Sequence, residues 1–152
     1  MSIVVWDGKT IAADRQATCA GMRSETTKIC KIRRKDETAI LAWTGGQHAG
    51  LLLAKWWEAG AADEFWPDCQ HHENRWSRLI VARKDYVEFY EQEPIALPVT
   101  ALFMAWGSGR DYAMGAMAMG ASATEAVEIA NRFDIDCGLG IDIFDLGELD
   151  VR

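Results

Sequence analysis

Residues 1–18, MSIVVWDGKTIAADRQAT, open the chain with two short apolar runs that flank an Asp-Gly pair. The first run, residues 3–6, is rich in β-branched side chains, which favour strands. Asp7-Gly8 is a strong signal for a tight turn, and residues 9–13 then return as a second strand. The sequence therefore predicts that the chain begins with a β-hairpin.

The rest of the chain alternates strand-like pairs with helical segments. We expect helices from Ala49 to about Gly60, from about 110 to 120, and from a cap at Ser122 or Thr124 to about 133. Further strands are expected at 27–33, 38–43, 77–83, 86–91, about 100–106 and 139–146. Because short turns join most neighbouring strands, the pattern predicts packed antiparallel sheets with helices outside, and not a doubly wound parallel sheet.

Size and composition limit the possible classes of protein. The 152 residues suffice for one domain, which we expect to span 1–152. No apolar run approaches the ~20 residues of a membrane span, and the N-terminus lacks the pattern of a signal peptide, so a soluble cytoplasmic protein is expected. The formal net charge of −7 disfavours nucleic acid as a partner.

The four cysteines are scattered without paired spacing, which is typical of reduced thiols rather than a disulfide framework. The segment 69–72, Cys-Gln-His-His, raises the possibility of a metal site. It lacks the second pair of ligands at zinc-finger spacing, so we expect neither a metal nor a cofactor.

The start of the chain also offers a candidate nucleophile. Ser2 is small, and aminopeptidases generally remove an initiator Met before such a residue. The exposed serine would carry a hydroxyl together with an α-amine of pKa ~7.7–8.0, which can act as a base at neutral pH. The opening hairpin would return Asp14 to the N-terminus, where it could hold Lys28; a plain ion pair is the alternative.

Two glycine-containing turns complete the set of candidate residues. Gly45, within Thr-Gly-Gly at 44–46, offers an unobstructed backbone N–H that suits an oxyanion hole, or marks a helix start. Ser108, within Gly-Ser-Gly at 107–109, offers a hydroxyl, or caps a helix.

Taken in order, these residues resemble the proteasome β-subunit and HslV-like superfamily of N-terminal nucleophile (Ntn) hydrolases, including its short prokaryotic and phage members. The resemblance covers nearly the whole chain. In that family an N-terminal Thr begins a strand, a turn with Gly follows, and an Ala-Asp pair ends the second strand. Ser2 falls at the position of the nucleophile. Asp14 falls at that of the Asp that binds the catalytic lysine, and Lys28, in TTKICKI, at that of the lysine.

Later motifs extend the resemblance. Gly45, in AWTGGQHAG, resembles the glycine of the oxyanion hole, and Ser108, in WGSGRDYAMGAM, a second serine brought to the N-terminus. Asp134, in RFDIDCGLG, resembles an Asp that helps to orient the terminal amine. The sequence departs from the family where Cys137 and Leu139 replace a Ser or Thr and a Gly, and where Ser2 replaces Thr and loses the methyl that limits its rotamers.

The resemblance implies an α+β fold, a four-layer αββα sandwich of two antiparallel sheets flanked by helices. It also implies a threonine-peptidase-like endopeptidase with a Ser nucleophile, acting on peptides or unfolded proteins and assembled as a homo-oligomeric ring or spiral; an unfoldase ATPase stays an open question. The alternatives are a non-catalytic structural subunit of such an assembly and an amidase for small molecules. Trp43 resembles part of the family's specificity pocket, where it would favour small substrate side chains; a core Trp is the alternative.

Overall fold

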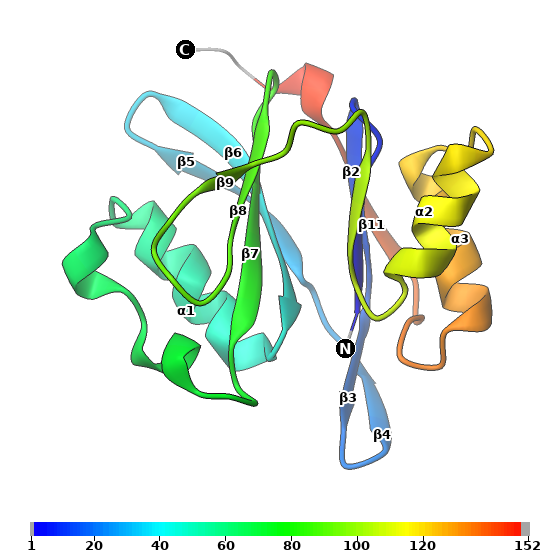
Figure 1. Ribbon diagram of the computed structural model, residues 1–152, viewed down its shortest axis with the longest axis horizontal. Helices are drawn as coiled ribbons and strands as arrows, with labels where there is room; N and C mark the ends of the chain where they lie inside the picture. The colour runs from blue at the N-terminus through cyan, green and yellow to red at the C-terminus, as the bar shows by residue number, and fades with distance from the viewer. Residues whose placement is uncertain (1, 150–152) are drawn as a thin grey trace.

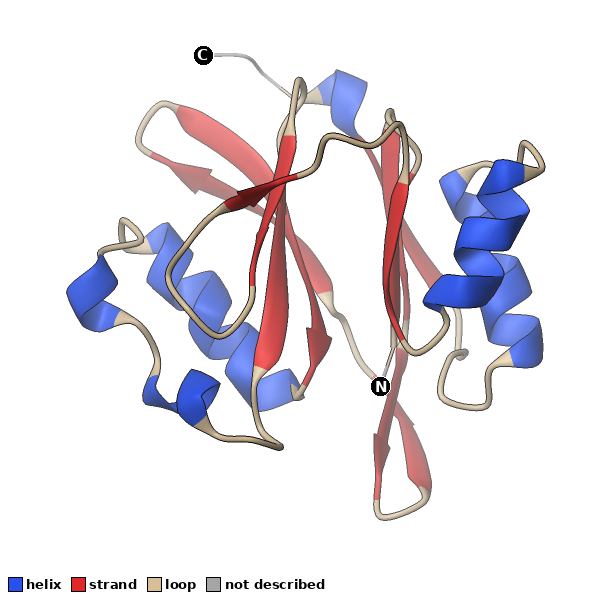
Figure 2. Cartoon of the chain, in the orientation of Figure 1, coloured by secondary structure: helices blue, strands red, loops and turns tan. Residues whose placement is uncertain are grey.

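The computed structural model describes residues 2–149 and arranges them in four layers (Figure 1). Two antiparallel sheets pack face to face in the middle. Helix α1 (Gln47–Glu58) covers the outer face of one sheet, and α2 (Arg110–Ala118) and α3 (Ala123–Phe133) cover the outer face of the other (Figure 2). This αββα arrangement is the predicted fold.

The first sheet contains the predicted N-terminal hairpin. Its strands lie in the order β10 (Met104–Gly107), β1 (Ile3–Trp6), β2 (Thr10–Asp14), β11 (Ile141–Asp145). The turn between β1 and β2 is held by Asp7, whose Oδ1 accepts the backbone N–H groups of Lys9 at 3.0 Å and Thr10 at 2.7 Å. Because β2 then runs antiparallel to β1, its last residue, Asp14, returns to the beginning of β1.

The second sheet consists of five antiparallel strands. They lie in the order β5 (Ile29–Arg34), β6 (Glu37–Gly45), β7 (Ser77–Ala82), β8 (Val87–Tyr90), β9 (Leu97–Pro98). In the pairing of β6 with β7, Thr44 lies opposite Arg78 and Gly45 opposite Ser77. The end of β6 and the start of β7 therefore lie together at one end of the sheet.

Three apolar clusters hold the layers together, one at each interface between neighbouring layers. Along β1, Val4 packs between the sheets, whereas Ile3 and Val5 pack against α2 and α3. The third cluster joins α1 to the second sheet. Both faces of β1 are buried, which explains why this strand is a continuous apolar run rather than an alternating one.

The structure differs from the sequence-based expectation in the segment after β2 and in the segment before β10. A hairpin of β3 (Gln16–Cys19) and β4 (Met22–Glu25) was not predicted, because its turn uses Ala20 and Gly21, both at positive φ, rather than a common Asn-Gly or Asp-Gly pair. The strand expected at about 100–106 begins only at Met104. The preceding residues cross from the second sheet, which contains β9, to the first, which contains β10, as Figure 1 shows.

The segment between α1 and β7 contains two short 3-10 helices, η1 (Asp63–Phe65) and η2 (Asp68–His71). Buried Gln70 ties it to β7: Nε2 donates to the carbonyl of Ser77 at 2.7 Å, and Oε1 accepts the Ser77 N–H at 2.9 Å. Within residues 2–149, no cluster of three potential metal-binding side chains is found, and no helix is long and apolar enough to cross a membrane.

Candidate active site

Ser2 lies immediately before β1, at the point where this strand meets the end of β10. Its side chain is buried, and its Oγ has no hydrogen-bond partner among the described residues. The close approach depends on Gly107, which pairs with Ile3 and has a φ of 109°. A Cβ at this position would lie 2.0 Å from the carbonyl oxygen of Ser2, so only glycine fits there.

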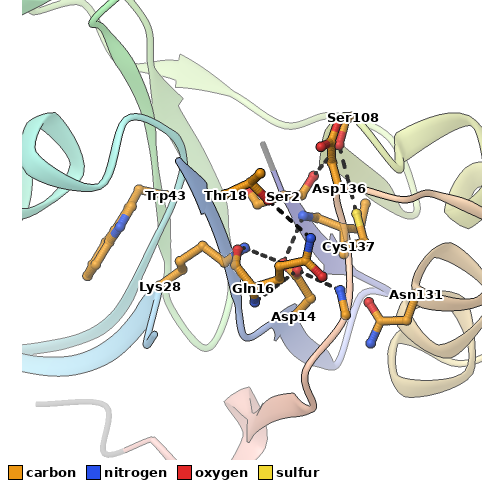
Figure 3. Close-up of polar contacts among 12 residues, drawn as sticks. Ser2, Asp14, Gln16, Thr18, Lys28, Trp43, Ser108, Asn131, Asp136 and Cys137 are labelled. Carbon is orange, nitrogen blue, oxygen red and sulfur yellow. Dashed lines mark hydrogen bonds and ion pairs between the residues drawn. The ribbon is translucent and has the colours of Figure 1, made fainter. Parts of the chain in front are cut away.

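A buried ion pair lies next to this serine. Lys28 is 4% exposed and Asp14 is fully buried, with the lysine Nζ donating to Asp14 Oδ1 at 2.5 Å. The same Oδ1 accepts the backbone N–H of Ile3 at 3.1 Å, which links the pair directly to the residue after Ser2. Figure 3 shows Lys28, Asp14 and Ser2 in this part of the site. Lys28 also donates to the carbonyl of Gln16 at 2.7 Å.

The other oxygen of Asp14 is equally well satisfied. Oδ2 accepts the backbone N–H groups of Gln16 at 3.2 Å and Gly138 at 3.1 Å. Burial lowers the pKa of Lys28, and the charge of Asp14 opposes this effect. An ammonium group in such a poorly solvated environment exerts a stronger field on its neighbours than one in water.

The turn between β6 and α1 forms another side of the site. Gly45 has a φ of 105°, and a Cβ there would lie 2.7 Å from the carbonyl oxygen of Trp76, so the position requires glycine. The next carbonyl, that of Gly46, accepts the Ser77 hydroxyl at 2.5 Å and the Gly50 N–H at 2.9 Å. These bonds fix the N-terminus of α1, whose partial positive charge favours an anion.

Ser108, Cys137 and Asp134 form a chain of polar contacts beside Ser2. The Ser108 hydroxyl donates to the carbonyl of Ser2 at 3.4 Å and lies 3.8 Å from the Cys137 sulfur. The Cys137 thiol donates in turn to Asp134 Oδ2 at 3.4 Å. Cys137, which the sequence marked only as a departure from the family pattern, thus links Ser108 to Asp134.

The protonation states of Cys137 and Asp134 agree with a hydrogen bond donated by the thiol to the carboxylate. Burial, together with the nearby Asp14 and Asp134 carboxylates, raises the pKa of the Cys137 thiol to about 12, so the thiol keeps its proton at neutral pH. Burial alone would raise the pKa of Asp134, but the hydrogen bond from the Asp136 N–H and its other polar contacts outweigh it and lower the pKa. A protonated donor therefore faces an ionised acceptor.

Ser2 borders a cleft of about 400 Å³. The residues that line it are Ser2, Thr44, Gly45, Gly46, Glu73, Asn74, Trp76, Arg78, Gly107, Ser108 and Arg110. Of the residues predicted from the sequence, Ser2, Gly45 and Ser108 thus share one cleft. Asp14 and Lys28 reach it through the Ile3 backbone, and Asp134 only through Cys137. The sequence indicated no role for Trp76 and Arg78, which no motif marks, or for Arg110, which lies within the WGSGRDYAMGAM segment quoted for Ser108.

Trp43 does not line the cleft, so the structure supports the core interpretation of this residue. The ring is 2% exposed and packs beneath α1, where its Nε1 donates to Gln47 Oε1 at 2.9 Å. It lies against Gly50, at which a Cβ would come within 2.1 Å of the ring.

A second cavity, of about 380 Å³, lies at the turn between β5 and β6. Its walls are Arg34, Lys35, Asp36, Glu37 and Gly60, and two of these charges already pair with each other, Arg34 with Glu37 at 3.1 Å. It contains no serine, cysteine or threonine nucleophile, so we place the candidate active site at Ser2.

No family model and no curated protein matches the sequence, but many solved structures match the fold. BPH from Thiobacillus denitrificans aligns with a TM-score of 0.68 and 21% identity, covering 97% of this chain and 100% of its own. HslV from Trypanosoma brucei aligns with a TM-score of 0.66 and 21% identity, covering 94% and 97%. The Gly-1 mutant of Anbu from Hyphomicrobium sp. strain MC1 aligns with a TM-score of 0.73 and 12% identity, covering 95% and 82%.

These alignments extend over nearly the whole chain. At such low identity they establish the fold, while the chemistry must be argued from the site itself. The resemblance read from the sequence is therefore confirmed at the level of architecture: the chain has the proteasome-like Ntn hydrolase fold of HslV and BPH.

Proposed function

We propose that this chain is an Ntn hydrolase, a proteasome-like peptidase that cleaves peptide or amide bonds with Ser2 once Met1 has been removed. The observation that supports this most strongly is the buried pair of Lys28 and Asp14, tied to the start of β1 by the Ile3 N–H. A buried ion pair contributes little net stability, because desolvation offsets the attraction between the charges. The ion pair would therefore add little to the stability of a purely structural subunit. In an enzyme, the positive charge of Lys28 would stabilise the negative charge that develops on a neighbouring nucleophile.

In the proposed mechanism, the free α-amine of Ser2 acts as the general base, through a water molecule, and takes the proton of the Ser2 hydroxyl. The hydroxyl has no other partner among the described residues and is free to give up this proton. The ammonium of Lys28 stabilises the developing alkoxide. The alkoxide then attacks the substrate carbonyl carbon and forms a tetrahedral intermediate.

The negative oxygen of this intermediate would be received at the turn between β6 and α1. The backbone N–H of Gly45 and the N-terminus of α1 supply preorganised dipoles there, and such dipoles are among the largest contributions to catalysis of acyl transfer. Collapse of the intermediate expels the amine, which takes a proton from the α-ammonium group. Water then hydrolyses the ester formed with Ser2 and regenerates the hydroxyl.

Ser108, Cys137 and Asp134 are proposed as positioning residues. Their contacts fix the carbonyl of Ser2, and with it the direction in which the terminal amine and hydroxyl point. For the substrate we propose peptides or unfolded proteins, and for the protein a homo-oligomer in the cytoplasm.

The decisive test compares wild type with Ser2→Ala, both shown by intact mass to lack Met1. We expect turnover of a fluorogenic peptide to fall more than about a thousandfold, because the nucleophile is lost, while the circular dichroism spectrum stays the same. Ser2→Thr should retain activity, and Ser24→Ala, which changes an exposed serine on β4, serves as the matched control. A Ser2→Ala variant that cleaves as fast as wild type would disprove the proposal.

A second readout uses a known ligand of a similar structure. BPH has been solved in complex with epoxomicin. We therefore expect epoxomicin to raise the unfolding temperature of the processed wild-type protein and to have no effect on Ser2→Ala. An equal effect on both proteins would argue that binding does not involve the proposed nucleophile.

A further inference from the structure

We infer that the cleft beside Ser2 selects substrates that carry a carboxylate close to the bond that is cleaved, and that Arg78 binds this carboxylate. The inference deepens the proposed function and rests on it for the identity of the cleaved bond. The predicted binding of a carboxylate does not depend on the proposed function, because the cleft and its charges exist whether or not Ser2 is active.

Arg78 is placed by the register of the second sheet. It lies opposite Thr44 on β6, next to the pairing of Gly45 with Ser77. Ile80 and Ala82, on the same face of β7, pack between the two sheets, so Arg78 points towards the first sheet, where Ser2 lies. Arg78 accordingly lines the same cleft as Ser2 and Gly45.

The guanidinium group of Arg78 is poorly satisfied by the protein. Its Nε is buried and has no hydrogen-bond partner among residues 2–149, and its ion pair with Glu91 is long, at 3.5 Å. Arg83, which directly follows β7, pairs instead with both Glu37 and Glu88. A guanidinium with unused donors in a cleft is suited to an external acceptor.

Arg110, the first residue of α2, brings a second positive charge to the cleft. Its Nη1 donates to the carbonyl of Gly107 at 3.2 Å, which keeps the side chain beside Ser108. Arg78 and Arg110 also both line an adjoining cavity of about 400 Å³, so the two cavities meet at these arginines. Glu73 lines the Ser2 cleft, and Glu91, the partner of Arg78, lines the adjoining cavity.

The lining of the Ser2 cleft itself is richer in positive than in negative side chains, although each arginine has a long ion pair outside that lining, Arg78 with Glu91 at 3.5 Å and Arg110 with Asp111 at 3.8 Å. The chain has a formal net charge of −7, yet the cleft next to the candidate nucleophile has two arginines against one glutamate. The planar fork of arginine binds a carboxylate through two parallel hydrogen bonds. The carboxylate could belong to an Asp or Glu side chain of the substrate or to its C-terminus, since both present the same group.

The inference can be tested by binding, without turnover. Labelled peptides are titrated into processed Ser2→Ala protein and followed by fluorescence anisotropy. The set has Glu moved through each position of an amidated peptide, the corresponding Gln peptides, and one Gln peptide with a free C-terminal carboxylate. We expect a Glu peptide, or the free acid, to bind about tenfold to a hundredfold more tightly than the neutral peptide.

Variants assign the effect to Arg78. Arg78→Met keeps the aliphatic part of the side chain and should abolish the preference, whereas Arg23→Met, on the exposed β4 strand, makes the same change of charge and should leave it intact. Glu91→Gln removes the ion-pair partner of Arg78 and should strengthen the preference. This variant keeps the test valid even if Arg78→Met does not fold.

The outcomes separate the two proposals. Equal binding of Glu, Gln and free-acid peptides, no detectable binding of any, or a preference that survives Arg78→Met in folded protein would overturn the inference. Tight binding of the acidic peptides with no turnover by wild type would instead support the carboxylate site and count against the proposed hydrolase. The peptide that binds more tightly, with an internal Glu or with a free C-terminus, identifies the source of the carboxylate.

Discussion

At the scale of single residues, variants of Lys28 and Asp14 can distinguish an effect on the stability of the fold from an effect on activity. Lys28→Met leaves the buried Asp14 charge without its partner and should lower the free energy of unfolding by about 3–5 kcal/mol. Adding Asp14→Asn removes that charge, but the amide NH2 then faces a backbone N–H that the carboxylate accepted, so the double variant should recover only part of the stability in a urea titration. It should stay inactive, because no ammonium faces Ser2. A double variant that regains activity along with stability would show the pair to be structural.

Cys137 allows a test of the proposed positioning residues. Cys137→Ser keeps a donor between Ser108 and Asp134, whereas Cys137→Val removes it from a buried polar chain. We expect Ser to retain most of the activity and Val to lower kcat about tenfold with little change in KM. Exposed Cys19 provides the control, because Cys19→Ser should change neither constant. Equal kcat values for the Ser and Val variants would exclude the proposed role.

At the scale of elements, the turn from Gly138 to Gly140 contains Leu139 where the family pattern has a glycine, and its backbone keeps a conformation that suits glycine. Leu139 has a φ of 60°, the left-handed conformation that suits the glycine expected from the family. Leu139→Gly should therefore raise the free energy of unfolding by about 1 kcal/mol, measured by urea denaturation. Leu139→Ala keeps the strain and should bring no such gain. If both substitutions have the same effect, strain at this turn is not the cause.

The elements also explain what the sequence could and could not predict. The hairpin of β1 and β2 and the pairs β5–β6 and β7–β8 could be predicted because apolar runs and turn residues specify them locally. The hairpin of β3 and β4 could not, since Ala20-Gly21 carries no common turn signal and most of its side chains are exposed. The start of β10 was misplaced because only the packing of the sheets shows where the chain crosses between them.

At the scale of the whole molecule, some residues of the candidate site could be predicted from the sequence, and others could not. Ser2 and Asp14 could be predicted because the opening hairpin brings them together, and Lys28, which lies just before β5, because its motif resembles that of the family. Arg78 and Arg110 come from β7 and α2, on different sides of the space between the sheets, and no spacing in the sequence relates them. Their meeting is a property of the four packed layers and not of any segment.

The outer surface supports a prediction about assembly. Tyr112 and Phe133 stack at 5.9 Å between their ring centres across α2 and α3, and nearby Ile135 is 81% exposed. Burial of such apolar side chains favours association. We expect wild type to sediment as a homo-oligomer and Phe133→Asp/Ile135→Asp to sediment as smaller species. Leu102→Asp, at an exposed site between β9 and β10, should leave the distribution unchanged. A monomeric wild-type protein would exclude self-association through this face.

Trp43 and Gly50 fit each other so closely that neither position can change freely by itself. A larger residue at 50 would collide with the indole, and a smaller residue at 43 would leave a void beneath α1. Two harmful single steps that are tolerated together define an epistatic pair. Natural variants of this chain should therefore change both positions together. An alignment of homologous sequences should show covariation between positions 43 and 50.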